Sequence, residues 1–207
     1  IRQVRFDTTS TETIDLVLLV NGVPVATLEL KTDNVQSIED AKKQYVQDRK
    51  PARSRRLLEP GRCLVHFAVS NEEVYMTTEL AGQATRFLPF NRGNDGHAGN
   101  PVSENGSATD YLWSWALERE LFLRILKDYA VWEPTASSAS GFRLVFPRVH
   151  QLRAVEAVTG GVSARGSGGS YLIWHSAGSG KTKTIAWLAH RLARHMDAAA
   201  NKTFDSV

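Results

Sequence analysis

The chain has 207 residues, of which 42% are hydrophobic and 23% charged, and it carries a formal net charge of +3. This composition is that of an ordinary soluble globular protein, and no apolar run approaches the roughly 18 residues that a membrane span needs. The single cysteine, Cys63, excludes an internal disulfide and a cysteine-based zinc site, which fits a reducing cytoplasm.

Two β-rich runs, 14–20 and 23–31, flank Asn21-Gly22 and predict a β-hairpin. Both apolar sets must face the same side of the sheet, which places the polar side chains together on the other side. The apolar set includes Leu16, Leu18, Leu28 and Leu30, which we expect to be buried. This arrangement excludes a two-residue loop that pairs Val20 with Val23. A three-residue loop with Gly22 in the left-handed conformation is expected instead.

The polar face of this hairpin carries Asp15, Glu29 and Lys31. Asp15 is expected opposite or diagonal to Glu29, within roughly 8 Å. Two carboxylates at that separation repel each other unless a cation lies between them, and Mg²⁺ prefers such oxygen ligands. Lys31 is suited to hold a water molecule and to stabilise negative charge on a phosphate. The pattern predicts metal-assisted phosphodiester hydrolysis, although Glu-x-Lys is also common on solvated strands.

A helix is predicted over 37–49, with Ser37 as its N-cap, and a basic segment follows it. The segment "RKPARSRR" contains five cations, Arg49, Lys50, Arg53, Arg55 and Arg56. Such a cluster can neutralise the phosphates of double-stranded DNA. A solvated basic loop without a partner is the alternative interpretation.

The middle of the chain contains further structural signals. The runs 63–70 and 73–78 predict a second hairpin, in which His66 is a packed residue rather than a ligand. A Gly/Asn-rich loop over 91–107 has a length typical of a functional or mobile loop. A helix over 111–132 carries an aromatic and aliphatic stripe that predicts core packing. The stripe consists of Trp115, Leu121, Phe122, Ile125, Leu126 and Tyr129.

The segment "HSAGSGKT", after a predicted strand over 171–174 and before a predicted helix over 181–195, is typical of a nucleotide-phosphate loop. The residues expected to contact the nucleotide are Gly178, Ser179, Gly180, Lys181 and Thr182. Lys181 is expected on the β- and γ-phosphates and Thr182 on Mg²⁺. Upstream, "FPRVHQLRAV" includes Gln151, whose amide has the donor and acceptor that match the edge of adenine.

The order of these motifs, including "FLPFNRGNDGHAGNP" over 87–101, resembles the restriction (R) subunit of type I restriction–modification enzymes. The resemblance implies a PD-(D/E)xK nuclease domain followed by a superfamily 2 helicase-like translocase. It implies Asp15 and Glu29 as metal ligands, Lys31 as the catalytic lysine and Gln151 as the adenine reader. His175 at the head of the loop is similar to the family pattern. Ala41 stands where the family's Gln-x-x-x-Tyr helix has glutamine, with Gln44 as a neighbouring substitute.

We therefore expect an α/β fold: a restriction-endonuclease-like mixed sheet flanked by helices over 1–133, a linker over 134–141, and the truncated start of a RecA-like domain over 142–207. The expected function is Mg²⁺- and ATP-dependent cleavage of double-stranded DNA in a cytoplasmic complex with modification and specificity subunits. This chain itself is expected to bind ATP poorly and not to hydrolyse it. The alternatives are a non-cleaving, nucleotide-gated DNA-binding or assembly module and a helicase–nuclease of another defence or repair system.

Overall fold

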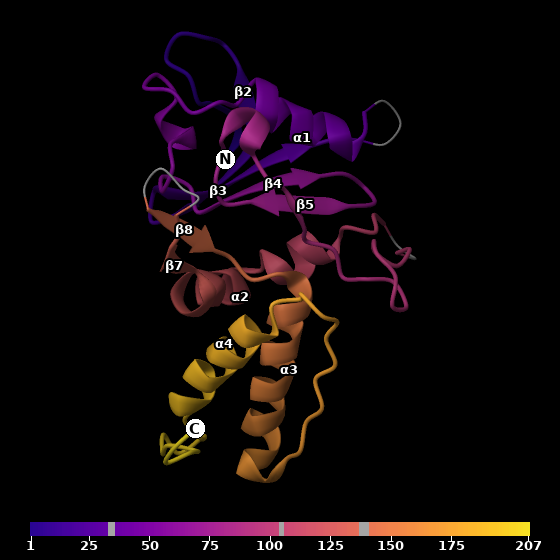
Figure 1. Cartoon of the computed structure of the whole chain (residues 1–207), viewed down its shortest axis with the longest axis vertical. Coiled ribbons are helices and arrows are strands. Elements are labelled where there is room, and N and C mark those ends of the chain that lie inside the picture. The colour runs from indigo at the N-terminus through magenta and orange to yellow at the C-terminus, as the bar shows by residue number, and fades with distance from the viewer. Residues whose placement is uncertain (33–35, 104–105, 137–140) are drawn as a thin grey trace. The chain divides into compact units, whose positions relative to one another are not determined.

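The first part of the chain forms a six-stranded mixed sheet in the order β1-β2-β3-β4-β5-β6 (Figure 1). The structure is a computed structural model, and it describes residues 1–32, 36–103, 106–136 and 141–207. The strands are β1 (Arg2–Arg5), β2 (Thr13–Val20), β3 (Val23–Leu30), β4 (Val65–Val69), β5 (Val74–Thr77) and β6 (Leu88–Pro89). Strands β3 and β4 run parallel, whereas the other neighbouring pairs are antiparallel. The predicted mixed α/β class is confirmed, as are both hairpins.

The turn between β2 and β3 differs from the predicted three-residue loop. Val20 pairs directly with Val23, so the loop contains only Asn21 and Gly22. Their φ angles of 50° and 81° are the left-handed values that such a tight turn requires. A register shift between Leu18 and Leu19 then restores the predicted pairing of the apolar faces. The prediction was therefore wrong for the turn, because a β-bulge supplies the extra residue within the strand.

Helix α1 (Ile38–Gln47) connects β3 to its parallel neighbour β4 and begins at the predicted N-cap, Ser37. The Asp40 carboxylate accepts a hydrogen bond from the Ser37 backbone N–H at 2.8 Å, which satisfies one of the free amides at the helix start. Tyr45 is fully buried, and its ring centroid lies 5.7 Å from that of His66 on β4. Helix α1 therefore covers the face of the sheet to which His66 points.

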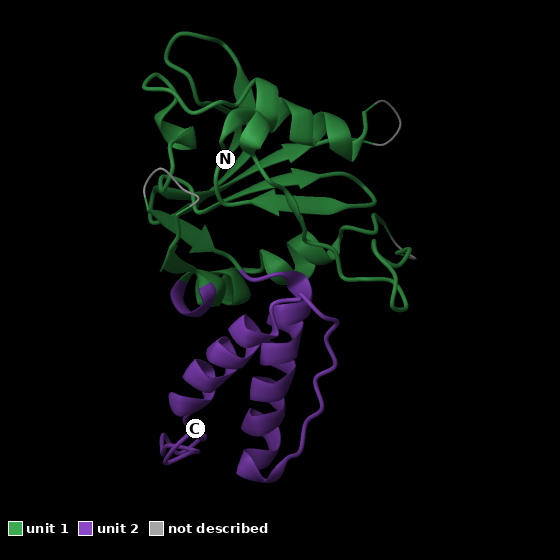
Figure 2. Ribbon diagram, viewed as in Figure 1, with its two compact units in different colours: residues 1–126, 130–146 green, residues 127–129, 147–207 purple. Residues whose placement is uncertain are grey.

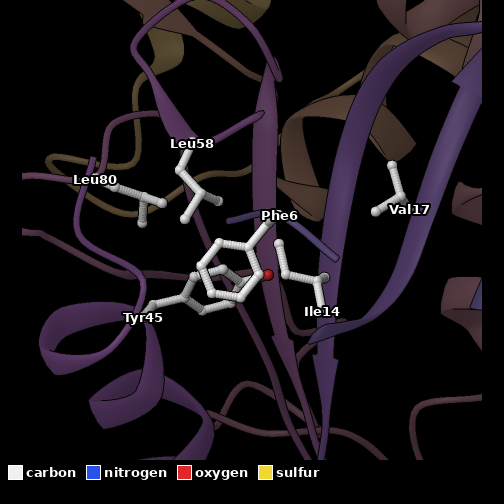
Figure 3. Close-up of a cluster of buried hydrophobic side chains, with 6 residues drawn as sticks. All are labelled: Phe6, Ile14, Val17, Tyr45, Leu58 and Leu80. Atoms are coloured by element: carbon white, nitrogen blue, oxygen red, sulfur yellow. The ribbon is translucent and has the colours of Figure 1, made fainter. Parts of the chain in front are cut away.

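Buried apolar side chains pack on both faces of the sheet. Figure 3 shows the rings of Phe6 and Tyr45 beside Ile14, in a cluster that Val17, Leu58 and Leu80 complete. On β4, Phe67 follows His66 and so points to the opposite face. Its ring centroid lies 5.3 Å from that of Phe90 and 6.2 Å from that of Phe146. The central strands are therefore enclosed from both sides, as is usual where strands run parallel.

The helix predicted over 111–132 is divided into three pieces. These are the π-helical η3 (Leu112–Ala116), α2 (Arg119–Arg124) and the π-helical η4 (Ile125–Tyr129). The carboxylate of Glu118 accepts hydrogen bonds from the amides of Glu120 and Leu121, so it caps a new helix where a continuous one was expected. The predicted core packing is confirmed for Leu121, Phe122, Ile125 and Tyr129, which are buried. The described residues also form short 3₁₀ helices, η1 (Arg56–Leu58), η2 (Gly82–Ala84) and η5 (Gly166–Gly168).

The C-terminal part of the chain contains α3 (Val149–Arg165) and α4 (Lys181–Ala193), which pack against each other. The indole N–H of Trp187 on α4 donates to the carbonyl of Tyr129 at 3.1 Å. The strand predicted over 171–174 is not formed, and Leu172 and Trp174 are more than nine-tenths exposed. A strand needs hydrogen-bonded neighbours, and no described segment pairs with these residues.

The chain divides into two compact units, coloured separately in Figure 2. The first comprises residues 1–126 and 130–146, and the second comprises residues 127–129 and 147–207. The division thus falls after the predicted linker 134–141. β7 (Val131–Pro134) and β8 (Phe142–Val145) pair antiparallel, so Pro134 of the predicted linker belongs to a strand; residues 137–140 of that linker lie outside the described residues. Within the described parts, no helix has both the length and the apolar character that crossing a membrane requires.

Candidate active site

Asp15 on β2 and Glu29 on β3 lie close enough for the charge of Asp15 to act on the Glu29 carboxyl group. They are adjacent in sequence to Leu16 and Leu28, which pair across the two strands. The Asp15 carboxylate accepts hydrogen bonds from the backbone N–H of Leu30 at 2.8 Å and from the side chain of Gln3 at 3.1 Å. Asp15 is thereby fixed beside the end of β3 that carries Glu29.

Glu29 is buried and forms an ion pair with Arg49. Only 1% of Glu29 and 4% of Arg49 is exposed, and Arg49 Nε donates to Glu29 Oε1 at 2.8 Å. The same guanidinium donates to the carbonyl of Thr13 at 3.0 Å and lies 4.6 Å from the ring centroid of Phe6. Arg49 was predicted to contact DNA, but in the structure it is an interior partner of the candidate site.

The environment of Glu29 shifts its protonation equilibrium. Burial raises the pKa of the Glu29 carboxyl group to about 7, although the positive charge and hydrogen bond of Arg49 act in the opposite direction. The negative charge of Asp15 adds to the increase. The second carboxylate oxygen, Oε2, is buried and has no hydrogen-bond partner. A buried oxygen of this kind is suited to accept a cation or a proton.

Lys31 follows at the carboxyl end of β3. Its backbone N–H donates to the carbonyl of Val69 at 2.8 Å, which attaches this end of β3 to β4. The alternation of the strand places its half-buried side chain on the same face as Glu29.

The apolar face beneath these residues is only partly closed, which corrects the predicted burial. Leu28 is fully buried, Leu16 and Leu18 are half-buried, and Leu30 is 36% exposed. The prediction assumed a hairpin with one solvated face. In the structure β3 is a central strand, and all five residues from Val25 to Glu29 are buried on either face.

A buried polar chain supports the strand beside Glu29. Thr27, two residues before Glu29, lies 2.8 Å from the Tyr45 hydroxyl and 2.7 Å from Nδ1 of His66. Burial lowers the pKa of His66 to about 3, so its ring is neutral at physiological pH. His66 is packed, as predicted, but its partners were not foreseen. The signal available in the sequence was a polar Thr27 on a strand whose neighbours are apolar.

The two carboxylates fit a Mg²⁺ ion better than they fit a transition metal. No group of three or more His, Cys, Asp or Glu side chains among the described residues is arranged to hold a metal. Mg²⁺, however, is commonly held by one or two carboxylates with water in its remaining positions. The free Oε2 of Glu29 and the adjacent carboxylate of Asp15 match that requirement.

The basic segment that follows α1 is divided between the interior and the surface. Arg55 donates to the carboxylate of Asp7 and to the carbonyl of Asp48, both at 2.6 Å. Lys50, Arg53 and Arg56, in contrast, are exposed. Three of the five predicted cations are therefore accessible to a polyanion.

In the second unit, the predicted phosphate loop leads into α4. Gly178 and Gly180 adopt φ angles of 72° and 84°, which favour glycine. Lys181 is the first residue of the helix, and its ammonium group donates to the carbonyl of Ser176 at 3.0 Å. Thr182 is exposed, whereas Ser179 and Gln151 are buried. Gly178, Ser179 and Gly180 thus form the loop, and Lys181 and Thr182 form the start of α4.

A protein-family model matches the first part of the chain. Residues 1–85 match the family described as "Type I restriction enzyme R protein N terminus (HSDR_N)". The matched region includes the β2–β3 hairpin, α1 and the basic segment, and it ends before the predicted phosphate loop. No curated protein sequence matches the chain.

The raised pKa of Glu29 predicts a defined pH dependence of stability. The folded state binds this proton more tightly than the unfolded state. Protonation of Glu29 therefore stabilises the fold fully below pH 4.5, and this stabilisation is lost as the pH rises from 4.5 through about 7. Between pH 4 and pH 8, Glu29→Gln is expected to gain up to about 3 kcal/mol of unfolding free energy relative to the wild type. Urea unfolding measured across this range tests the prediction, with the exposed Glu72→Gln as control. A constant difference between Glu29→Gln and the wild type would contradict it.

Proposed function

Residues 1–85 belong to the family of type I restriction enzyme R protein N-termini, and we propose that the β2–β3 hairpin carries a Mg²⁺-dependent site that cleaves double-stranded DNA. The observation that supports this most strongly is a buried Glu29 whose Oε2 has no hydrogen-bond partner, with the charged carboxylate of Asp15 nearby. A buried carboxylate oxygen without a partner is costly in a purely structural role. It is favourable where the protein holds a cation.

In the proposed site, each residue has a separate task. Asp15 and Glu29 would hold Mg²⁺, with Glu29 using Oε2 while Arg49 retains Oε1. Bound Mg²⁺ supplies Lewis-acid polarisation of the phosphate and lowers the pKa of a bound water. Lys31 donates to the phosphate oxygens or to the attacking water, where negative charge develops. Restriction-endonuclease-like topology of the sheet is part of this proposal, because it would place these residues as the related nucleases do.

We extend the proposal to the assembly in which this site would act. An R protein of a type I restriction enzyme would function with modification and specificity subunits, which supply recognition of the DNA sequence. Lys181 and Thr182 would bind the phosphates and Mg²⁺ of ATP, as part of a helicase-like motor. The support is the loop geometry at the start of α4.

A second candidate function is a non-cleaving module that binds DNA and assembles with other subunits. It is favoured by one observation: Glu29 is buried and already neutralised by Arg49, as in a structural ion pair. The two candidate functions make different predictions for Lys31. DNA cleavage would use its ammonium group, whereas a structural ion pair between Glu29 and Arg49 would not.

Substitution of Lys31 tests the cleavage site. Lys31→Ala is expected to reduce Mg²⁺-dependent DNA cleavage by roughly 10²–10³-fold, because the lysine acts on charge that develops in the transition state. DNA binding and metal binding are expected to stay near wild type. Cleavage is measured in a complex reconstituted with modification and specificity subunits.

Lys43→Ala, on the exposed side of α1, is the matched control and is expected to cleave normally. Lys31→Ala is preferable to Glu29→Ala, which would leave the buried Arg49 with only its longer contact to Glu12 at 3.7 Å as an ion pair. Cleavage by Lys31→Ala at the wild-type rate would exclude this hairpin as the active site and favour the non-cleaving module.

The exposed part of the basic segment is expected to bind the DNA backbone. A triple variant in which glutamine replaces Lys50, Arg53 and Arg56 should bind DNA more weakly, by the same factor for every DNA sequence. The slope of log K against log salt should become shallower by up to about 0.9 for each lost phosphate contact. Fluorescence anisotropy at several salt concentrations measures both effects. Neutralising the exposed Lys43, Arg86 and Arg119 is the control. Equal changes in both triple variants would contradict a specific role for the segment.

A further inference from the structure

The first turn of α3 holds the phosphate loop by two adjacent side chains. Nε2 of Gln151 donates to the carbonyls of Ser179 and Gly180, at 3.3 and 3.1 Å. Nε2 of His150 lies 2.9 Å from the same Ser179 carbonyl, so this nitrogen carries the proton. The two carbonyls that receive these bonds immediately precede Lys181, the first residue of α4.

The oxygen and both N–H groups of the Gln151 amide have partners within the protein. Its Oε1 accepts from the backbone N–H of Arg148 at 2.9 Å, while its two N–H groups face two carbonyls. The partners also fix which end is oxygen. A flipped amide would direct oxygen at two carbonyl oxygens and N–H₂ at an N–H group. Only 4% of Gln151 is exposed, so the side chain is held in this orientation.

The loop approaches Gln151 so closely that position 180 needs glycine. A Cβ atom on Gly180 would lie 2.5 Å from Nε2 of Gln151, so the amide would have to move away from its present position. The φ angle of 84° at Gly180 independently favours glycine. The backbone of the loop is therefore packed directly against the glutamine amide.

We propose that Gln151 is a positioning residue that fixes the phosphate loop, with His150 as a second brace, and that Gln151 does not select the nucleobase. This inference rests on the proposed binding of a nucleotide at the loop. It replaces the interpretation of Gln151 as an adenine reader. To present its donor and acceptor to a base, the buried amide would have to give up three hydrogen bonds.

A glutamine that positions the loop and a glutamine that reads the base differ in which ligands they affect. Loss of the Gln151 amide should loosen the loop and so weaken every ligand that carries a triphosphate. ATP, GTP and inorganic tripolyphosphate should be affected by the same factor. A base reader, in contrast, would affect ATP alone.

Hydrogen exchange of the whole chain tests the positioning role without any ligand. Gln151→Met keeps the size of the side chain and removes its donors, whereas Gln151→Glu turns a donor into an acceptor that faces two carbonyls. Both are expected to speed exchange of the Ser179, Lys183 and Thr184 amides by at least about tenfold, because these amides bond the Ser176 and Gly180 carbonyls and would open locally when the loop loosens. Arg153→Met, at an exposed position of the same helix, is the control and should leave this exchange unchanged. Wild-type exchange in a folded Gln151→Met variant would overturn the inference.

A titration followed by ³¹P NMR, which detects weak binding, separates the two roles of Gln151. ATP, GTP and tripolyphosphate are added in turn to the wild type and to Gln151→Met. Equal weakening of all three supports the positioning role, and weakening of ATP alone overturns it. If the wild type binds none of them, the proposed nucleotide site fails, and the exchange experiment alone decides the role of Gln151. His150→Phe, which keeps a ring and removes the donor, is expected to give a smaller effect in the same direction.

Discussion

The ion pair between Arg49 and Glu29 is the interaction on which the architecture of the first unit depends. The Arg49 and Glu29 side chains, 2.8 Å apart and both buried, join the second residue after the end of α1 to the centre of the sheet. The Thr13 carbonyl and the Phe6 ring hold the guanidinium from the side of β1 and β2. Removing one partner of such a pair typically costs about 3–5 kcal/mol, because the other charge remains buried. The pair therefore ties the end of α1 back to β3, the strand that precedes it in the chain.

The same pair shows how Glu29 can be buried and still keep one carboxylate oxygen without a partner. Arg49 binds Glu29 through one oxygen only, so the other oxygen stays available within the protein. Asp15 is fixed independently, through the Leu30 amide and Gln3. Thr27, Tyr45 and His66 support β3 by neutral hydrogen bonds, since the His66 ring carries no charge at neutral pH. Two carboxylates thus remain adjacent because different parts of the fold hold each of them.

Local signals in the sequence were sufficient for much of this fold. The N-cap at Ser37, the two hairpins and the start of α4 at Lys181 all follow from residue patterns within a few positions. The bulge at Leu18 and Leu19 could not be foreseen, because an Asn-Gly turn and a matched apolar face made conflicting demands on the register. The inward orientation of Arg49 depends on Glu29, 20 residues earlier, and a charge cluster does not reveal which members turn inward. The run 171–174 has strand character, but strand pairing is a property of neighbours rather than of the segment.

We propose that Asp15 and Glu29 bind one divalent metal ion. A crystal structure of the chain soaked with Mn²⁺, with an anomalous difference map, tests it most directly. The account predicts a single anomalous peak within about 2.2 Å of one oxygen of Asp15 and of Oε2 of Glu29, with Arg49 still bound to Oε1. The absence of a peak at this position at saturating Mn²⁺, with the Glu29–Arg49 pair intact, would contradict it.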